Sequence, residues 1–260
     1  MAVKKSPAGG RGRAGFPAAA VAFLITALVF YLATVSVREE KTGKAVIKPA
    51  YDAREITLNG GTYWFVALGN AENAEACRIL CARYTQRGAA GYQMIRDGRH
   101  LCIGNVYIEE EEAGYMAQKI TKEGIEAEAF SVSEDNLILR FSADLETLDA
   151  LDEIIKVLGD SEKALLSVSE RLDAGTLSKR EAGAILSVIR YDLGVREEYA
   201  KKSGAAKTVG AVMNLYLDAL SDADGLLTEA GGEMILSARI KHCVIRMIDR
   251  RLALISELSD

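Results

Sequence analysis

The same strand-helix-strand pattern occurs twice within residues 63–132, and this repeat limits the folds that the chain can adopt. Each half begins with a short apolar run that ends at a glycine, Gly69 or Gly104, and continues as an amphipathic helix that stops at a second glycine, Gly88 or Gly124. The two halves are offset by about 35 residues. The order β-α-β-β-α-β is the split βαβ arrangement, and it predicts an α+β fold whose antiparallel sheet carries both helices on one face.

The composition of each segment supports this order. Residues 63–68 are an apolar run that begins with aromatic and β-branched side chains, and Asp97-Gly98 is typical of a tight hairpin turn. Asn70 is expected to cap the first helix, along which apolar residues recur at helical spacing. The expected strands are residues 63–68, 92–95, 101–103 and 125–132, and the expected helices begin at residue 70 and span residues 109–122.

Four stretches match a known pattern: residues 66–69 (Val-Ala-Leu-Gly), residues 72–76 at the start of the first helix, Gly88 at its end, and residues 101–105 (Leu-Cys-Ile-Gly-Asn). On these residues, the segment 61–132 resembles the SPOR domain, a small module that binds peptidoglycan. The resemblance implies binding to glycan strands, especially strands stripped of their stem peptides. It also implies a role at sites of wall remodelling during cell division or sporulation.

The sheet face opposite the two helices is the expected glycan-binding surface. Because successive strand residues point to opposite faces, Tyr63 and Phe65 share the face of Ala67, whereas Leu101 and Ile103 are expected on the helix side. Aromatic rings can pack on the apolar faces of sugars, and His and Asn side chains can supply hydrogen bonds. The candidate peptidoglycan-binding residues are Tyr63, Phe65, Ala67, Asn70, His100 and Cys102.

Two alternatives to glycan binding follow from the same residues. Ala67, Asn70 and His100 stand where members of the SPOR family commonly carry Gln, a small polar residue and Arg. In the first alternative, the SPOR-like fold has lost glycan binding and the protein is an assembly or scaffold protein that acts through protein-protein contacts. In the second, Tyr63 and Phe65 are covered by residues 136–141 or by the C-terminal helices, so that the sheet is a docking platform.

An uncharged apolar run at residues 17–37, about 20 residues long, is sufficient for a helix to cross a hydrocarbon layer of about 30 Å. Residues 1–16 carry basic side chains and no acid, so the positive-inside rule places this tail in the cytoplasm and everything after Arg38 outside it. We expect a single-pass protein of the cell membrane in which residues 38–60 are a linker, with a short strand as an alternative for residues 55–58. A cleavable signal peptide is the alternative.

Residues 133–260 are expected to form a helical domain, with a possible extra strand at residues 136–141. The expected helices are residues 144–158, residues 162–172 capped by Ser161, a helix that begins at the Ser178-Glu181 capping box, and helices near residues 205–220 and 232–258. Amphipathic helices must bury their apolar stripes against one another, so they predict an antiparallel bundle. We expect this domain to contact a protein partner that the sequence does not identify.

Composition excludes several classes of ligand. The formal net charge is −5, and the chain beyond the basic tail is more acidic still, so nucleic acid and anionic wall polymers are poor ligands. Cys77, Cys81, Cys102 and Cys243 lie in apolar stripes and are interpreted as small core residues, with no disulfide framework. The alternative is a metal held by Cys77 and Cys81, one helical turn apart, together with nearby His or acidic side chains.

The sequence gives no reason to expect catalysis, a metal or a cofactor. Only two histidines occur, His100 and His242, and no motif marks a nucleophile beside them, although His100 and Cys102 could form a Cys-His pair on one strand. The acids of residues 109–112 suit the positive end of a helix dipole and do not mark a glycosidase pair. We therefore expect a non-enzymatic peptidoglycan-binding protein, and a wall hydrolase is a further alternative.

Overall fold

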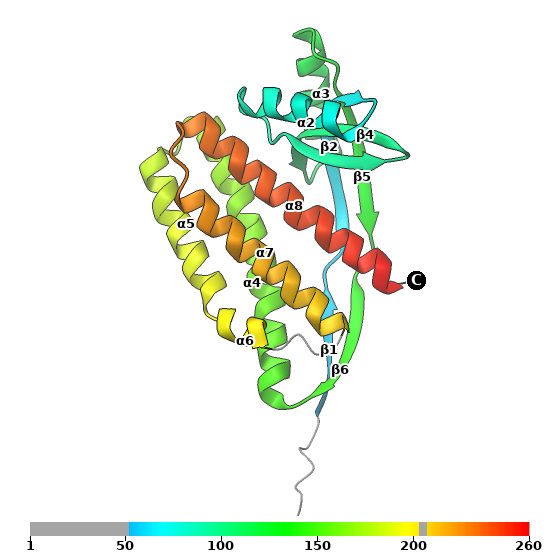
Figure 1. The fold of residues 1–260 in the computed structure, drawn as a ribbon, viewed down its shortest axis with the longest axis vertical. Helices are drawn as coiled ribbons and strands as arrows, with labels where there is room; N and C mark the ends of the chain where they lie inside the picture. Colours follow the sequence, from blue (N-terminus) through cyan, green and yellow to red (C-terminus); the bar gives the residue numbers. More distant parts are fainter. Residues whose placement is uncertain (1–51, 203–206, 260) are drawn as a thin grey trace, which may run out of the picture. The chain divides into compact units, whose positions relative to one another are not determined.

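Strand β2 (Gly61–Ala71) pairs on both sides and lies inside a four-stranded antiparallel sheet. The computed structural model describes residues 52–202 and 207–259, and within these residues the sheet has the order β3-β4-β2-β5. The other strands are β3 (Tyr92–Arg96), β4 (Arg99–Tyr107) and β5 (Glu128–Glu134), and the helices are α2 (Ala74–Thr85) and α3 (Glu110–Lys122). The order β-α-β-β-α-β agrees with the sequence prediction (Figure 1).

The expected basic tail and membrane span, residues 1–16 and 17–37, lie outside the described residues, as does most of the expected linker. Across residues 52–202 and 207–259, no helix combines the length and the apolar character that a membrane crossing needs. The described end of the expected linker is a strand, as the alternative for residues 55–58 predicts. Asp52–Leu58 form strand β1, in which Ile56 and Leu58 are buried, because alternate side chains of this strand face the core.

Strands β1 and β6 (Leu137–Ala143) extend the pairing of β2 with β5 beyond the four-stranded sheet. We call this continuous two-stranded pairing, β1 with β6 and β2 with β5, the central ladder. Leu58 pairs with Leu137, and Gly61 pairs with Glu134, so the register of β1 with β6 continues that of β2 with β5 across a short break. At the break, the amide of Gly60 donates to the side chain of Asn136 at 2.9 Å. The strand expected at residues 136–141 therefore exists, but it pairs with β1 and adds no fifth strand to the four-stranded sheet.

Two helix starts differ from the sequence prediction. Helix α2 is capped by Asn73, whose side chain accepts from the amide of Ala76 at 2.9 Å, because β2 continues past Asn70 to Ala71. Helix α4 (Leu145–Asp173) is one continuous helix where two were expected. Ser161, the expected cap of the second, lies inside α4 and is buried, because the apolar stripe runs through this point without changing phase.

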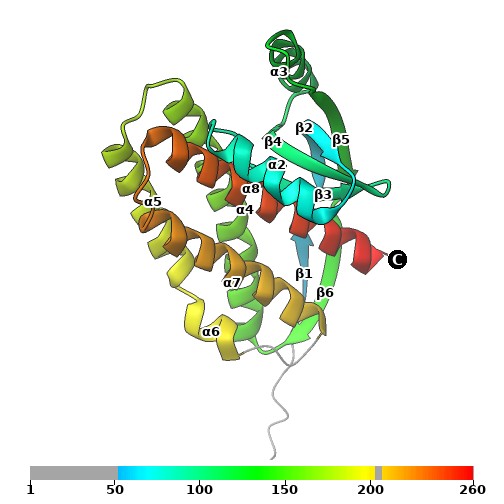
Figure 2. The ribbon, with the colours of Figure 1, turned by 45° about the horizontal axis from the view of Figure 1, so that its top comes forward.

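The remaining helices pack with α4 as a bundle, as the sequence predicts. They are α5 (Lys179–Gly194), α6 (Glu197–Lys202), α7 (Lys207–Leu227) and α8 (Glu233–Ser259). The expected capping box is present, with the Ser178 side chain on the Glu181 amide and the Glu181 side chain on the Ser178 amide. Helix α8 contacts α4 and α7 and also contacts β3, β4 and β5 (Figure 2). One hydrophobic core therefore runs from the sheet into the bundle.

Candidate functional site

The sheet face expected to bind glycan is covered by the chain itself. Phe65 and Ala67 are each 0% exposed and belong to one apolar cluster with Val244 and Ile248 of α8. Phe65 also stacks on Phe130 of β5, with ring centroids 5.7 Å apart. The expectation of an open face is therefore wrong for this structure. The alternative in which the C-terminal helices cover the face describes it correctly, because the apolar stripe of α8 needs a second surface beyond the bundle.

The expected placement of the β4 side chains is also wrong. Ala67 pairs with Ile103, so Ile103 shares the α8-facing side with Ala67, and Cys102 points to the opposite side. Cys102 is 0% exposed and packs against Cys77 and Cys81 of α2. Register shifts on both sides of Ala67 account for the error, because a bulge changes which residues face each other and leaves no mark in simple alternation.

The six candidate residues do not form one surface. Phe65, Ala67 and Cys102 are buried, and Tyr63 is partly buried beside α8. Asn70 is exposed at the other end of β2, and His100 lies beside it, because Asn70 pairs with Leu101 and Ala71 pairs with His100. The imidazole Nδ1 of His100 is 3.3 Å from the Gln93 amide nitrogen. The structure brings together only Asn70 and His100 as accessible members of the set.

A buried ion pair lies where the central ladder breaks. One guanidinium nitrogen of Arg251 in α8 donates to both carboxylate oxygens of Glu162 in α4 at 3.0 Å and to the Tyr63 hydroxyl at 2.8 Å. The other terminal nitrogen donates to the carbonyl of Gly60 at 3.4 Å and to that of Asn59. Arg251 and Glu162 are each 8% exposed. Burial and the adjacent Glu162 charge raise the pKa of Tyr63, so this phenol stays neutral.

A second buried cation of α8, Lys241, holds the end of α2. Its ammonium group donates to Asp173 at 2.5 Å and to the carbonyl of Gly88 at 3.0 Å. The next residue, His242, contacts the carbonyl of Ala90 at 3.2 Å, and burial lowers its pKa. Sequence reasoning missed Lys241 as a contact residue. The available signal was its position on the apolar stripe of α8, where a charge is buried unless it has a partner.

A cavity of about 510 Å³ lies between α2 and α3 on the other face of the sheet. Its apolar lining includes Leu68, Tyr84 and Ile120, and its polar lining includes Arg87 and Glu123. The remaining lining residues are Val66, Gly88, Ala89, Gly104, Asn105, Tyr107, Met116, Ile125, Asp173 and Lys241. A mainly apolar hollow of this size with a few polar groups is typical of small-ligand sites.

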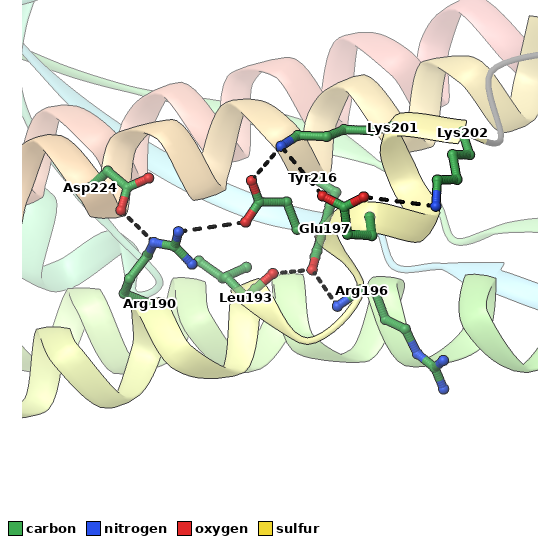
Figure 3. Close-up of polar contacts among 9 residues, drawn as sticks. Arg190, Leu193, Arg196, Glu197, Lys201, Lys202, Tyr216 and Asp224 are labelled. Carbon is green, nitrogen blue, oxygen red and sulfur yellow. Dashed lines mark hydrogen bonds and ion pairs between the residues drawn. The ribbon is translucent and has the colours of Figure 1, made fainter.

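A third group of polar side chains joins α5, α6 and α7 (Figure 3). Glu197 accepts from Lys201 at 2.7 Å and lies 3.5 Å from Arg190, which also pairs with Asp224. The hydrogen bond from Lys201 lowers the pKa of Glu197. Because each of these charges has an opposite charge beside it, the group is suited to holding α6 against α5 and α7 and offers no unpaired acid or base.

Tyr216 fixes the turn from α5 to α6 (Figure 3). Its ring is buried in the bundle, its hydroxyl donates to the Leu193 carbonyl, and the amide of Arg196 donates to it at 3.1 Å. Both backbone groups lie at the end of α5, where helix termini leave such groups without helical partners. This hydroxyl therefore satisfies the turn and is not available to a ligand.

The cysteines are core residues, as the sequence predicts. Cys77, Cys81, Cys102 and Cys243 are all buried. Burial raises the pKa of Cys77 to about 12, and the contact with Cys102 raises that of Cys81. Such thiols stay protonated at neutral pH and are poor nucleophiles. Across the described part of the chain, no group of three or more His, Cys, Asp and Glu side chains is arranged to hold a metal ion.

Comparison of the chain with protein-family models, curated proteins and solved structures finds no match in any of the three.

Proposed function

We propose that this protein is a non-catalytic assembly protein of the cell envelope, anchored in the membrane by residues 17–37. In this proposal, residues 61–132 are a SPOR-like domain whose sheet is a docking platform for the C-terminal helices. The observation that carries the proposal is the complete burial of Phe65 and Ala67 beneath α8. A face that is filled by the chain's own core cannot also hold a glycan strand.

The energetic cost of uncovering this face supports the proposal. Each large apolar side chain that leaves the core forfeits about 1.5–3 kcal/mol, and Phe65 would lose α8 as a neighbour and keep only its partner on β5, Phe130. Separating α8 from the sheet would also break the contacts of Arg251 with the ladder and of Lys241 with Gly88. Glycan recognition through this face would therefore require most of the stability of a typical domain, about 5–15 kcal/mol.

Contact with a protein partner is supported by an apolar stripe on α5 and its C-cap. Val188, Tyr191 and Val195 are 59%, 73% and 54% exposed and follow one another at helical spacing. Aromatic and aliphatic side chains at spacings of three and four residues are typical of helices that bind another helix. Such a surface fits an assembly role better than a polysaccharide-binding role.

The proposed location rests on charge and hydropathy in the first 37 residues. A basic tail before an uncharged run favours a cytoplasmic N terminus, which leaves the domain after Arg38 outside the cell. A reporter that is active only outside the cytoplasm, fused after residue 260, is expected to be active. Loss of that activity on moving the four basic residues of the tail to the other side of the run would support the charge argument, and an inactive C-terminal fusion would contradict the orientation.

The decisive experiment is pelleting of the full-length protein with purified wall sacculi. Sacculi treated with an amidase carry glycan strands without stem peptides, and untreated sacculi are the matched control. We expect no enrichment on the treated sacculi. Enrichment on them would show that a glycan-binding surface persists and would overturn the assembly proposal.

A variant can distinguish two possibilities: the protein has lost its glycan-binding site, or α8 covers a site that still works. Arg251→Ala removes the hydrogen bonds of α8 to the backbone of Asn59 and Gly60, and Arg78→Ala, whose side chain is 72% exposed in an ion pair with Glu75, is the control. If glycan binding has been lost, neither variant pellets with treated sacculi. Pelleting by the Arg251 variant alone would mean that α8 conceals a working site.

A further test addresses the proposed lack of catalysis. The full-length protein is expected to leave the turbidity of a wall suspension unchanged, since burial raises the pKa of the Cys77 and Cys243 thiols to about 12 and makes them poor nucleophiles. Clearing of the suspension by the protein, but not by a heat-treated sample, would replace the assembly proposal with a hydrolase.

A further inference from the structure

On the side of the sheet that α2 and α3 cover, the buried apolar residues form two separate clusters. Leu68 packs with Ala113 and Ala117 of α3 in one apolar cluster, whereas Cys77 of α2 belongs to a second cluster. The cavity of about 510 Å³ lies between the two helices, and the partly buried Tyr84 and Ile120, which pack against the Leu68 cluster, line it. An apolar wall left in contact with water is a source of binding free energy for a ligand with an apolar group.

The two helices end at this cavity in the same way. The carbonyl of Tyr84 accepts from the amides of Arg87 at 2.9 Å and Ala89 at 3.2 Å. In the second half, the carbonyl of Ile120 accepts from the amides of Glu123 at 3.1 Å and Ile125 at 3.4 Å. Gly88 and Gly124 follow with φ of 89° and 83°, values that favour glycine. All eight of these residues except Gly124 line the cavity, and they correspond pairwise between the halves.

This correspondence places opposite charges at equivalent positions of the cavity lining. Arg87 follows the end of α2, and Glu123 follows the end of α3, and both side chains are exposed. Within residues 52–202 and 207–259, neither makes an ion pair or a side-chain hydrogen bond. The other two charges of the lining, buried Lys241 and exposed Asp173, pair with each other at 2.5 Å. The cavity therefore presents one free cation and one free anion among the described residues.

We propose that this cavity binds a short zwitterionic peptide with an apolar side chain. Arg87 pairs with the terminal carboxylate, Glu123 pairs with the terminal ammonium group, and the apolar side chain lies against Tyr84 and Ile120. The side-chain amide of Asn105, which also lines the cavity, has the donor and acceptor that a peptide bond requires. A volume of about 510 Å³ suits two or three residues, since small-ligand pockets span roughly 300–1,000 Å³.

The test is a titration of the full-length protein, labelled at methionine methyl groups, with the dipeptide leucyl-alanine. Met116 lines the cavity, so its methyl resonance is expected to shift and to saturate. N-acetyl-leucyl-alanine lacks the ammonium group, leucyl-alanine amide lacks the carboxylate, and glycyl-glycine lacks the apolar side chains. Each is expected to bind more weakly than leucyl-alanine, because each removes one of the three proposed contacts.

Charge variants assign the two ends of the peptide. Glu123→Gln is expected to weaken leucyl-alanine about two- to fivefold, in line with an exposed ion pair, and to leave N-acetyl-leucyl-alanine unchanged. Arg87→Gln is expected to weaken leucyl-alanine by the same factor and to leave the amide unchanged. Lys122→Gln, an exposed change beside Glu123 that does not line the cavity, is the matched control and is expected to have no effect.

Two results would overturn the peptide site. Absence of a Met116 shift at millimolar leucyl-alanine would mean that the cavity takes no such ligand. Equal affinity for leucyl-alanine and its two charge-deleted forms would mean that the lining recognises apolar groups alone. Either result is independent of the assembly proposal, which is decided by sacculus pelleting.

Discussion

Arg251 of α8 and Glu162 of α4 form a buried ion pair in which one guanidinium nitrogen lies 3.0 Å from both carboxylate oxygens. Because Arg251 also donates to the backbone of Gly60, the pair joins two helices to the break in the central ladder. The first prediction concerns this pair. Arg251→Ala is expected to lower the free energy of unfolding by about 3–5 kcal/mol, since it leaves a buried carboxylate without its partner. Urea denaturation measures the change.

The control for this prediction is Arg78→Ala, which removes an exposed ion pair with Glu75 and is expected to cost about 0–1 kcal/mol. The double substitution of Arg251→Met and Glu162→Leu is expected to recover a large part of the loss, because no uncompensated charge remains. A loss below about 1 kcal/mol in the Arg251 variant would contradict the buried pair.

The second prediction concerns Phe65 as a core residue. Phe65→Ala is expected to cost about 3–5 kcal/mol, because it opens a cavity between Phe130 and α8. Ile95→Ala, on a strand of the same sheet but 67% exposed, is the control and is expected to change stability by no more than about 0.5 kcal/mol. Equal effects of the two substitutions would mean that the face is open in solution.

The third prediction concerns the glycine at the ladder break. A Cβ atom at Gly60 would overlap the carbonyl groups of Glu134 and Asp135, so Gly60→Ala is expected to destabilise the protein by at least about 1–3 kcal/mol. Gly114→Ala on α3 meets open space and is expected to stabilise the protein by about 0.5–1 kcal/mol. The thermal unfolding temperatures of the two variants should shift in opposite directions. An unchanged unfolding temperature for Gly60→Ala would contradict the close approach of Gly60 to the carbonyl groups of Glu134 and Asp135.

The fourth prediction concerns pH. Burial lowers the pKa of His242 below its ordinary value of 6.5, and the nearby Arg239 charge acts in the same direction. The unfolded chain therefore binds a proton that the folded chain excludes, and the free energy of unfolding decreases as pH falls through about 6.5. His242→Gln removes this titration, so its stability is expected to decrease less between pH 7.5 and 5.5. The same decrease in both proteins would contradict the assignment.

Much of the fold could be predicted from periodic patterns. The glycines at the ends of the two halves, the alternating strands and the Ser178 capping box all reflect local chemistry that one segment contains by itself. The start of α2 at Asn73 and the continuity of α4 through Ser161 were harder to predict from the sequence, because both depend on packing. Local propensity alone cannot separate such cases.

The candidate site could not be predicted in the same way. The register shifts beside Ala67 turned Cys102 toward α2, and the burial of Phe65 depends on α8, which lies far along the chain. Lys241 and Arg251 on the apolar stripe of α8 are the signal that the sequence does contain. Charges at such positions indicate a surface that the helix must cover, because a buried charge requires a partner.

The shared register of β1 with β6 and of β2 with β5 has a mechanical consequence. The hydrogen bonds of an antiparallel ladder are perpendicular to the strands, so tension applied along β1 at Asp52 acts on many of them at once in shear. Since β6 leads directly into α4, the same tension reaches the bundle through a stiff element. The paired strands β1–β6 and β2–β5 are therefore suited to transmit force between the sheet and the helices, because their hydrogen bonds share the load and do not break one after another.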